Sequence, residues 1–333
     1  MDPVSQGALG AALPQAFARP EHVRSYALLG CLSGMAPDLD VLIQSDVDPL
    51  LFLEYHRQFT HSFLFIPIGA LICATILFLP LRSKIDFKQA YLACFLGYAA
   101  HGSLDACTSY GTQLLWPFSD LRLDWSNVSV IDPLFTIPLI LLGLAAFFWR
   151  KPWIALIGLV WALGYLTVGF TQQTRAEEAA RTLVEKRGHL ALRFEVKPSF
   201  GNLLVWKLIY EHEGRYYVDA IRAGSEVTVC QGTSIAKLDT HAQFPWMRIS
   251  SQQAIDIERF RWFSNDFLGT QPDDPDLIID VRYSTLPHHI DGLWGIRIDR
   301  GTSDSGHVTF ETRREDRSSQ FPRLVNMVLG ESC

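Results

Sequence analysis

The chain has 333 residues, which is long enough for two domains. Hydrophobic residues make up 48% of it and charged residues only 19%, a balance that indicates a membrane protein with its charges concentrated in one part. The net charge of −6 gives no reason to expect a nucleic-acid partner, because such a partner requires a basic stripe.

The cysteines and the N-terminus carry few signals. The six cysteines are spread singly along the chain, so their spacing predicts neither a disulfide framework nor a thiolate zinc site. Residues 1–20 lack a basic stretch followed by an apolar core, and Pro14 and Pro20 interrupt them. Insertion into a membrane is therefore expected to rely on internal apolar segments.

Two short helices rich in small residues are predicted over residues 5–17 and 25–36, and Pro37 ends the second. Asp38 and Asp40 follow this proline directly. Carboxylates at such a position are often the caps of a turn. They are equally suited to bind a metal or to act as general bases, and the sequence leaves both interpretations open.

Four apolar segments are predicted to cross a bilayer. About 20 apolar residues span a hydrocarbon core of about 30 Å. Arg150, Lys151 and Pro152 form a tight basic turn between the last two segments, and Asp132 before Pro133 is expected to cap the third. The segments are residues 62–81, 89–107, 131–149 and 153–170.

Imidazole and carboxylate groups cluster around the first two of these segments. His56 and His61 come just before the first, and His101 and Asp105 lie near the end of the second. At positions i and i+4 of a helix, the last two side chains share one face and could hold one ion. Imidazole and carboxylate are ligands of zinc, manganese and iron. The alternative for each residue is a solvated or hydrogen-bonded polar group at a helix end.

Basic loops predict the orientation. Short loops rich in Lys and Arg remain cytoplasmic, which assigns Arg82, Lys84 and Lys88 to the cytoplasmic side together with the basic turn at 150–151. By alternation, all the candidate site residues then fall near the extracytoplasmic face.

The composition changes after Phe170. Residues 1–172 are expected to form the membrane-embedded helical domain, residues 173–187 an exposed linker helix, and residues 188–333 a β-rich extracytoplasmic domain with Glu213 and Gly214 in a hairpin turn. The predicted fold class is thus an α-helical polytopic membrane bundle followed by a β-rich soluble domain.

Five motifs stand out in the first half of the chain: the opening MDPVSQGALGAA, GMAPDLD at 34–40, HRQFTHS at 56–62, HGSLDACTSYG at 101–111 and LWPF at 115–118. Together they resemble the YdjM family (DUF457) of inner-membrane, metal-dependent hydrolases. The resemblance covers roughly residues 1–170 and implies a bacterial cytoplasmic (inner) membrane protein without an agreed substrate. The HRQFTHS stretch also resembles, more distantly, the histidine-rich helices of zinc-dependent phospholipases C.

The leading hypothesis is a metal-dependent hydrolase that acts at the outer face of the membrane on an amphiphilic phosphoester or ester substrate. His56, His61, His101 and Asp105 would bind a divalent metal, with zinc as the first choice, while Asp38 and Asp40 would complete a second metal position or serve as general base. Arg57 would steady an anionic group, or would pair with Asp38 or Glu54. The alternative function is a non-catalytic membrane protein with a structural polar cluster and a partner-binding soluble domain.

Overall fold

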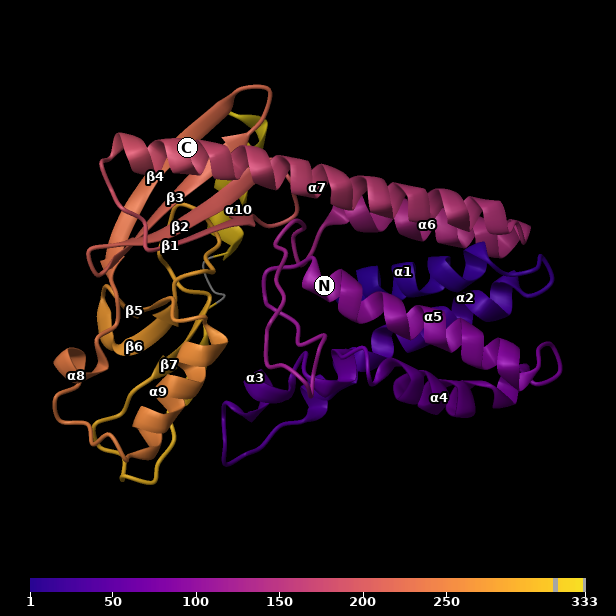
Figure 1. The fold of residues 1–333 in the computed structure, drawn as a ribbon, viewed down its shortest axis with the longest axis horizontal. Coiled ribbons are helices and arrows are strands. Elements are labelled where there is room, and N and C mark those ends of the chain that lie inside the picture. Colours follow the sequence, from indigo (N-terminus) through magenta and orange to yellow (C-terminus); the bar gives the residue numbers. More distant parts are fainter. Residues whose placement is uncertain (314–316, 332–333) are drawn as a thin grey trace. The chain divides into compact units, whose positions relative to one another are not determined.

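The computed structural model describes residues 1–313 and 317–331, and these residues divide into two compact units. The first unit is helical and consists of residues 1–43, 55–171 and 200–202. The second consists of residues 44–54, 172–199 and the chain from Leu203 onward. The ribbon in Figure 1 follows the chain from the helices of the first unit to the strands of the second.

Helices α1 (Pro3–Ala16), α2 (Val23–Met35) and α5 (Phe87–Ala106) form the centre of the first unit. Their contact depends on glycine, because a Cβ at Gly30 would overlap the carbonyl oxygen of Gly10, and a Cβ at Gly97 would overlap that of Gly30. Such close backbone approach is the reason for the small residues that mark these segments in the sequence.

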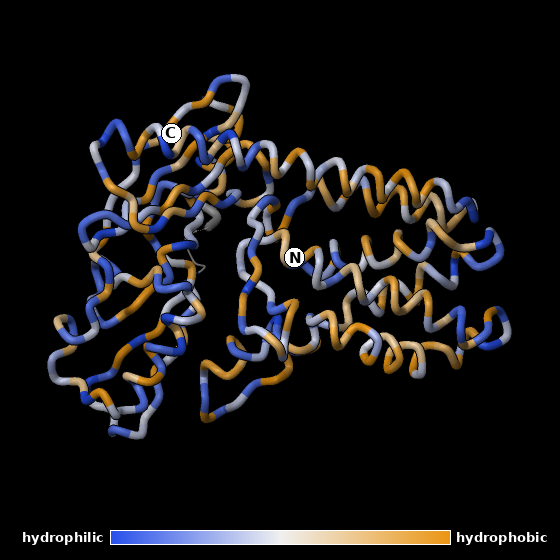
Figure 2. Tube along the Cα trace, in the orientation of Figure 1, coloured by the Kyte–Doolittle hydropathy of each residue, from blue (hydrophilic) through white to orange (hydrophobic). Residues whose placement is uncertain are grey.

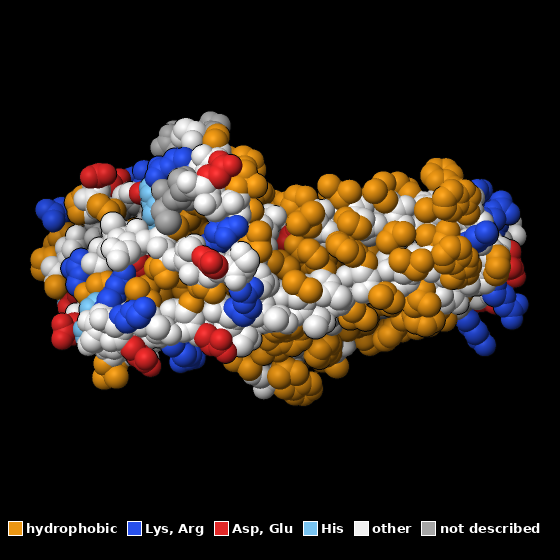
Figure 3. All heavy atoms as spheres, turned by 90° about the horizontal axis from the view of Figure 1, so that it is seen from above, with side chains coloured by type: hydrophobic (Ala, Val, Ile, Leu, Met, Phe, Trp, Pro, Cys, Tyr) orange, Lys and Arg blue, Asp and Glu red, His pale blue; other side chains and the backbone are white. Residues whose placement is uncertain are grey.

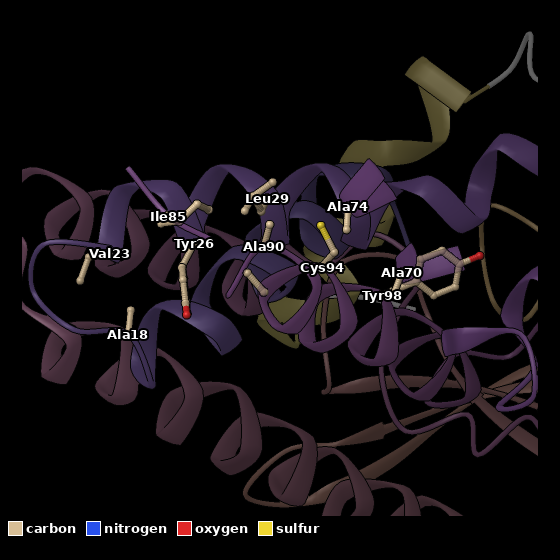
Figure 4. Packing of buried hydrophobic residues seen from close by; sticks show 11 residues of the cluster. Ala18, Val23, Tyr26, Leu29, Ala70, Ala74, Ile85, Ala90, Cys94 and Tyr98 are labelled. Carbon is tan, nitrogen blue, oxygen red and sulfur yellow. The ribbon is translucent and has the colours of Figure 1, made fainter. Parts of the chain in front are cut away.

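Helix α4 (Ile66–Leu77) packs on α2 and α5 through a core of small and aromatic side chains (Figure 4). Ala70 and Ala74 of α4 meet Ala90, Cys94 and Tyr98 of α5 there. Short 3-10 helices flank α4, namely η2 (Phe59–His61) before it and η3 (Leu79–Leu81) after it, while η1 (Ala36–Leu42) continues α2.

The last helices of the unit are α6 (Pro133–Trp149) and α7 (Pro152–Lys186), of which α7 continues into the second unit. The predicted cap of α6 is confirmed, because the Asp132 carboxylate accepts the backbone N–H groups of Leu134 and Phe135. Tyr165 of α7 also donates to this carboxylate, at 2.8 and 2.9 Å, and so fixes α7 against α6.

The prediction of a polytopic bundle is wrong. Among the described residues one helix, α7, is long and apolar enough to cross a membrane; a second would exist only if the stretch Leu51–His61 and α4, bent by 86°, counted as one span. The apolar run at 62–81 yields only 12 helical residues, because its first four form a turn and Pro80 lies in η3. A helix of that length covers about 18 Å of a core of about 30 Å. Helix α6 has 17 residues, and α5 carries too many polar groups.

The surface of the helical unit is nevertheless strongly apolar. Figure 3 shows hydrophobic side chains along its helices and Lys and Arg side chains gathered at one end, and Figure 2 shows the same apolar character along the chain of α4 and α6. The exposed side chains of α4, α6 and α7 include Ile72, Leu141 and Val160.

The second unit contains two antiparallel sheets, each of four strands in sequential order, so its predicted β-rich character agrees with the structure. The Glu213–Gly214 turn is confirmed, since both residues have positive φ angles and join β2 to β3. Strands β1 (Arg193–Pro198), β2 (Val205–His212), β3 (Arg215–Ala223) and β4 (Val227–Ala236) form the first sheet. Strands β5 (Leu268–Gln271), β6 (Asp274–Asp280), β7 (Trp294–Arg297) and β8 (Thr309–Thr312) form the second.

Four helices accompany the sheets: α3 (Leu51–Tyr55), α8 (Thr240–Gln243), α9 (Gln252–Phe263) and α10 (Arg317–Leu329). Arg259 of α9 binds Asp48 and Glu54, which attaches the segment 44–54 to this unit.

Cys230 is disulfide-bonded, contrary to the prediction from cysteine spacing, while Cys31, Cys73, Cys94 and Cys107 are free thiols. Cys333 lies outside the described residues.

Candidate metal centre

Three segments of the helical unit bring histidine and aspartate side chains to one point. Asp38 and Asp40 lie on η1, His61 ends η2, and His101 and Asp105 lie in the last two turns of α5. One ligand atom each from Asp38, His61, His101 and Asp105 lies within 4.8 Å of the others, a grouping that could hold a metal ion. His61 and Asp105, which are far apart in sequence, are only 3.2 Å apart between Nε2 and Oδ2.

The two imidazoles face one another. His101 Nε2 lies 2.9 Å from His61 Nε2, and Asp38 Oδ1 lies 3.3 Å from His101 Nε2 and 3.5 Å from His61 Nε2. All four side chains are buried except Asp38, which is 17% exposed. Nitrogen and oxygen acceptors therefore converge at a largely buried point, with Asp38 on its exposed side.

Hydrogen bonds to the far side of each ring determine where its proton lies. His101 Nδ1 donates to the Gly34 carbonyl oxygen at 2.6 Å. Thr60 Oγ1 gives its only proton to Asp40 Oδ2, so it accepts at 2.9 Å from His61 Nδ1. Both rings thus carry a proton at Nδ1 and turn Nε2 toward the other ring. Partners of this kind orient metal-binding histidines in known centres.

Asp40 organises this support. Its Oδ2 accepts the backbone N–H of Arg57 at 3.0 Å and the Thr60 hydroxyl at 2.7 Å, and its Oδ1 lies 2.7 Å from His56 Nδ1. Burial raises the pKa of Asp40, but its hydrogen bonds with His56 and His61 outweigh burial and hold that pKa well below its usual range. Asp40 is therefore an ionised carboxylate with its acceptor positions occupied.

Asp105 is held by residues on its other side. The Met1 α-amino group and Gln6 Nε2 both donate to its Oδ1. Its Oδ2 is buried and accepts no hydrogen bond from the described residues, although Arg57 Nε lies 3.1 Å away. A buried carboxylate oxygen without a donor is costly unless a positive charge faces it. Arg57 supplies such a charge, and a cation bound at this oxygen would supply a second one.

Glu54, one of the two partners predicted for Arg57, pairs with Arg259. The Arg57 guanidinium lies beside Asp105, donates to Thr108 Oγ1 at 3.0 Å and covers the ring of Tyr110. The side chain is buried and the residue has a φ of 66°.

His56 lies apart from the closest group, and Asp38 lies in it. His56 forms a second grouping with Asp38 and Asp40, and its side chain is 32% exposed.

Sequence reasoning missed Thr60, Gln6 and the Gly34 carbonyl, which orient the other residues. Thr60 could have been suspected from its position beside His61, whereas Gln6 carried no signal on a helix of small residues.

Comparisons with known proteins agree with a membrane assignment. A family model described as YdjM inner membrane protein matches residues 1–176. The chain is also 25% identical over 130 residues to a Bacillus subtilis protein described as uncharacterized protein YfhP, a match that covers 39% of each chain. No solved structure matches the chain.

Proposed function

Because the chain belongs to the YdjM inner membrane protein family, we propose that its helical unit is a membrane-bound, metal-dependent hydrolase. The observation that carries the proposal is the convergence of four acceptors from Asp38, His61, His101 and Asp105 on one buried point. Lone pairs that face one another in a low dielectric repel, so either a cation or a shared proton must lie between them. Imidazole and carboxylate suit zinc and related divalent ions.

In this proposal Asp38, His61, His101 and Asp105 hold the ion. When bound, a divalent cation supplies Lewis acidity, which polarises the bond under attack and makes water a better nucleophile at neutral pH. Asp40 positions His61 and His56, and Arg57 positions Asp105. His56 keeps its Nδ1 proton on Asp40, so its partly exposed ring can accept a proton at Nε2. The substrate is an amphiphile with a phosphoester or ester bond.

Metal analysis of the detergent-purified chain tests the centre. We expect stoichiometric divalent metal in the wild type, and none in the double variant His61→Ala, Asp105→Ala. His22→Ala is the matched control, because it removes an imidazole of the same unit outside the polar group. A panel of lipid phosphoesters and esters then tests hydrolysis. Absence of metal from a folded wild type would mean that a shared proton joins the two imidazoles, and the hydrolase would be abandoned.

We also propose that the centre faces the extracytoplasmic side. The turns at the other ends of the helices carry exposed basic residues, namely Arg19, Arg82, Lys84, Lys88, Arg150 and Lys151. Basic turns of this kind stay on the cytoplasmic side. Helix α7 begins at this basic end and continues into the β-rich unit. This course of the helix supports an extracytoplasmic location for the β-rich unit.

The disulfide at Cys230 supports the same side, because disulfides persist in oxidising compartments. Fusions of alkaline phosphatase and of a green fluorescent protein to the C-terminus test it. We expect an active phosphatase and a dark fluorescent protein, and the reverse pattern would overturn the orientation.

A further inference from the structure

The segments that turn polar side chains toward the centre turn large apolar side chains the other way. On η1, Asp40 is 3% exposed whereas Leu39 is 63% and Leu42 is 74% exposed. Two and three residues after His61, Phe63 and Leu64 are each 49% exposed. The loop after α5 presents Phe118, which is 85% exposed, and Leu115. We call these six side chains the apolar rim: Leu39, Leu42, Phe63, Leu64, Leu115 and Phe118.

Backbone contacts hold the pieces of the apolar rim to one another and to the centre. The Phe63 N–H donates to the Leu114 carbonyl at 2.9 Å, and the Gln113 N–H donates to the Arg57 carbonyl at 3.0 Å. Helix η1 contacts both η2 and α4. Beneath the rim, the ring of Phe59 contacts the rings of Phe65 and Trp116. The rim is therefore a supported surface, and its position is tied to that of the ligands.

The apolar rim continues into the exposed face of α4. Ile68, Leu71, Ile72 and Ile76 are about half exposed or more, and residues 62–81 contain no charged side chain. A contiguous exposed apolar surface of this kind marks a contact with another phase or partner. Since the chain is an inner membrane protein by family, and the exposed face of α4 has no charged side chain for a protein partner to match, the occupant of this surface is lipid.

We propose that the apolar rim inserts at the boundary between the headgroups and the hydrocarbon of the bilayer, so that the polar centre opens at the lipid surface. If the centre is the hydrolase proposed above, its substrate is then a lipid-like molecule that enters from the leaflet with its headgroup bond toward Asp38 and His56. That step rests on the proposed function, whereas the membrane contact of the rim does not.

Photocrosslinking in nanodiscs of phosphatidylethanolamine and phosphatidylglycerol tests the contact. The full chain would carry p-benzoylphenylalanine in place of Phe118 or, separately, Leu42. A third protein would carry the photocrosslinker in place of Ile249 of the β-rich unit. Ile249 is 77% exposed and therefore serves as a reference whose exposure is similar to that of Phe118 and Leu42. We expect lipid adducts at both rim positions, at least several-fold above the reference. Adduct yields equal to the reference, or adducts to protein, would overturn the proposal.

A second measurement separates the rim from the enzyme. Phe118→Ser should lower hydrolysis of a vesicle-embedded phosphoester several-fold, while hydrolysis of a water-soluble short-chain phosphoester stays unchanged. Equal rates on vesicles for the variant and the wild type would remove the rim from substrate access. A wild type that hydrolyses neither substrate would contradict the proposed function alone, because the crosslinking result decides the membrane contact by itself.

Discussion

His61 and His101 direct their Nε2 atoms at one another across 2.9 Å, while each ring binds an acceptor on its other side. This relationship joins η2 to α5 across 40 residues of sequence. It also limits what can lie between the rings, because two lone pairs require a positive charge between them.

Asp40→Asn should weaken metal binding without removing a ligand. The amide can still accept from Thr60, but it loses the charge that holds His61 Nδ1–H, which lies 3.3 Å from Asp40 Oδ2. Loss of such a supporting group costs about 10–100-fold in metal affinity. Competition with a chromophoric chelator measures the affinity, and Asp46→Asn, in an exposed loop, is the control. An unchanged affinity would show that Asp40 does not support the centre.

Much of the centre could be predicted from the sequence because the i, i+4 pair His101–Asp105 and the closely spaced His56 and His61 are local patterns. Asp38 rather than His56 joins the closest group because η1 is a 3-10 helix that continues α2, and no local pattern indicates how such a turn aims a carboxylate. The orienting bonds of Gln6 and Gly34 depend on the packing of α1 and α2 against α5, which residue spacing does not encode.

The fold was predicted less well in the helical unit. Apolar composition indicated spans at 62–81 and 131–149, but composition does not show where Pro80 and the turn before Ile66 shorten a helix. The hairpin at Glu213–Gly214 was predictable because the residue types of a tight turn are themselves the signal.

Gly30→Ala should destabilise the helical unit and lower its metal content. The added methyl group would meet the Gly10 carbonyl oxygen and the ring of Pro14, so α1 must move away from α2. Overpacking of this kind typically costs about 1–3 kcal/mol. Gly164→Ala on α7 is the matched control, since nothing lies within 4 Å of its added Cβ and helix propensity favours alanine. Thermal unfolding in detergent should show a lower midpoint for Gly30→Ala only.

Lys207 of β2 should make the stability of the β-rich unit depend on pH. Burial lowers the pKa of Lys207 to about 7; Asp280 and Asp291 act against this effect and Lys197 adds to it. The unfolded chain, with a lysine pKa near 10.4, binds more protons than the folded chain between these values. The stability contribution is therefore absent below about pH 7 and rises as the pH increases toward about 10.

Lys207→Met should flatten this dependence. The ammonium group donates to Ser284 Oγ and the His289 carbonyl oxygen, so the variant also loses two bonds, but that loss has no such slope with pH. Urea unfolding of the full chain between pH 7 and 10, followed by the fluorescence of the β-rich unit, measures the difference. Parallel curves for the wild type and the variant would mean that Lys207 titrates normally in the folded protein.

Arg57→Met should destabilise the metal-free protein more than the metal-loaded one. Its guanidinium is the charged side chain next to the buried Oδ2 of Asp105, an atom with no hydrogen-bond donor among the described residues. Removing one partner of a buried ion pair costs about 3–5 kcal/mol because the other charge is left without compensation. A cation at the same oxygen would supply that compensation, so added zinc should raise the unfolding midpoint more in Arg57→Met than in the wild type. Arg19→Met, at the exposed basic end, should respond to zinc as the wild type does. Equal zinc responses in Arg57→Met and the wild type would place the ion away from Asp105 and remove this residue from the ligand set.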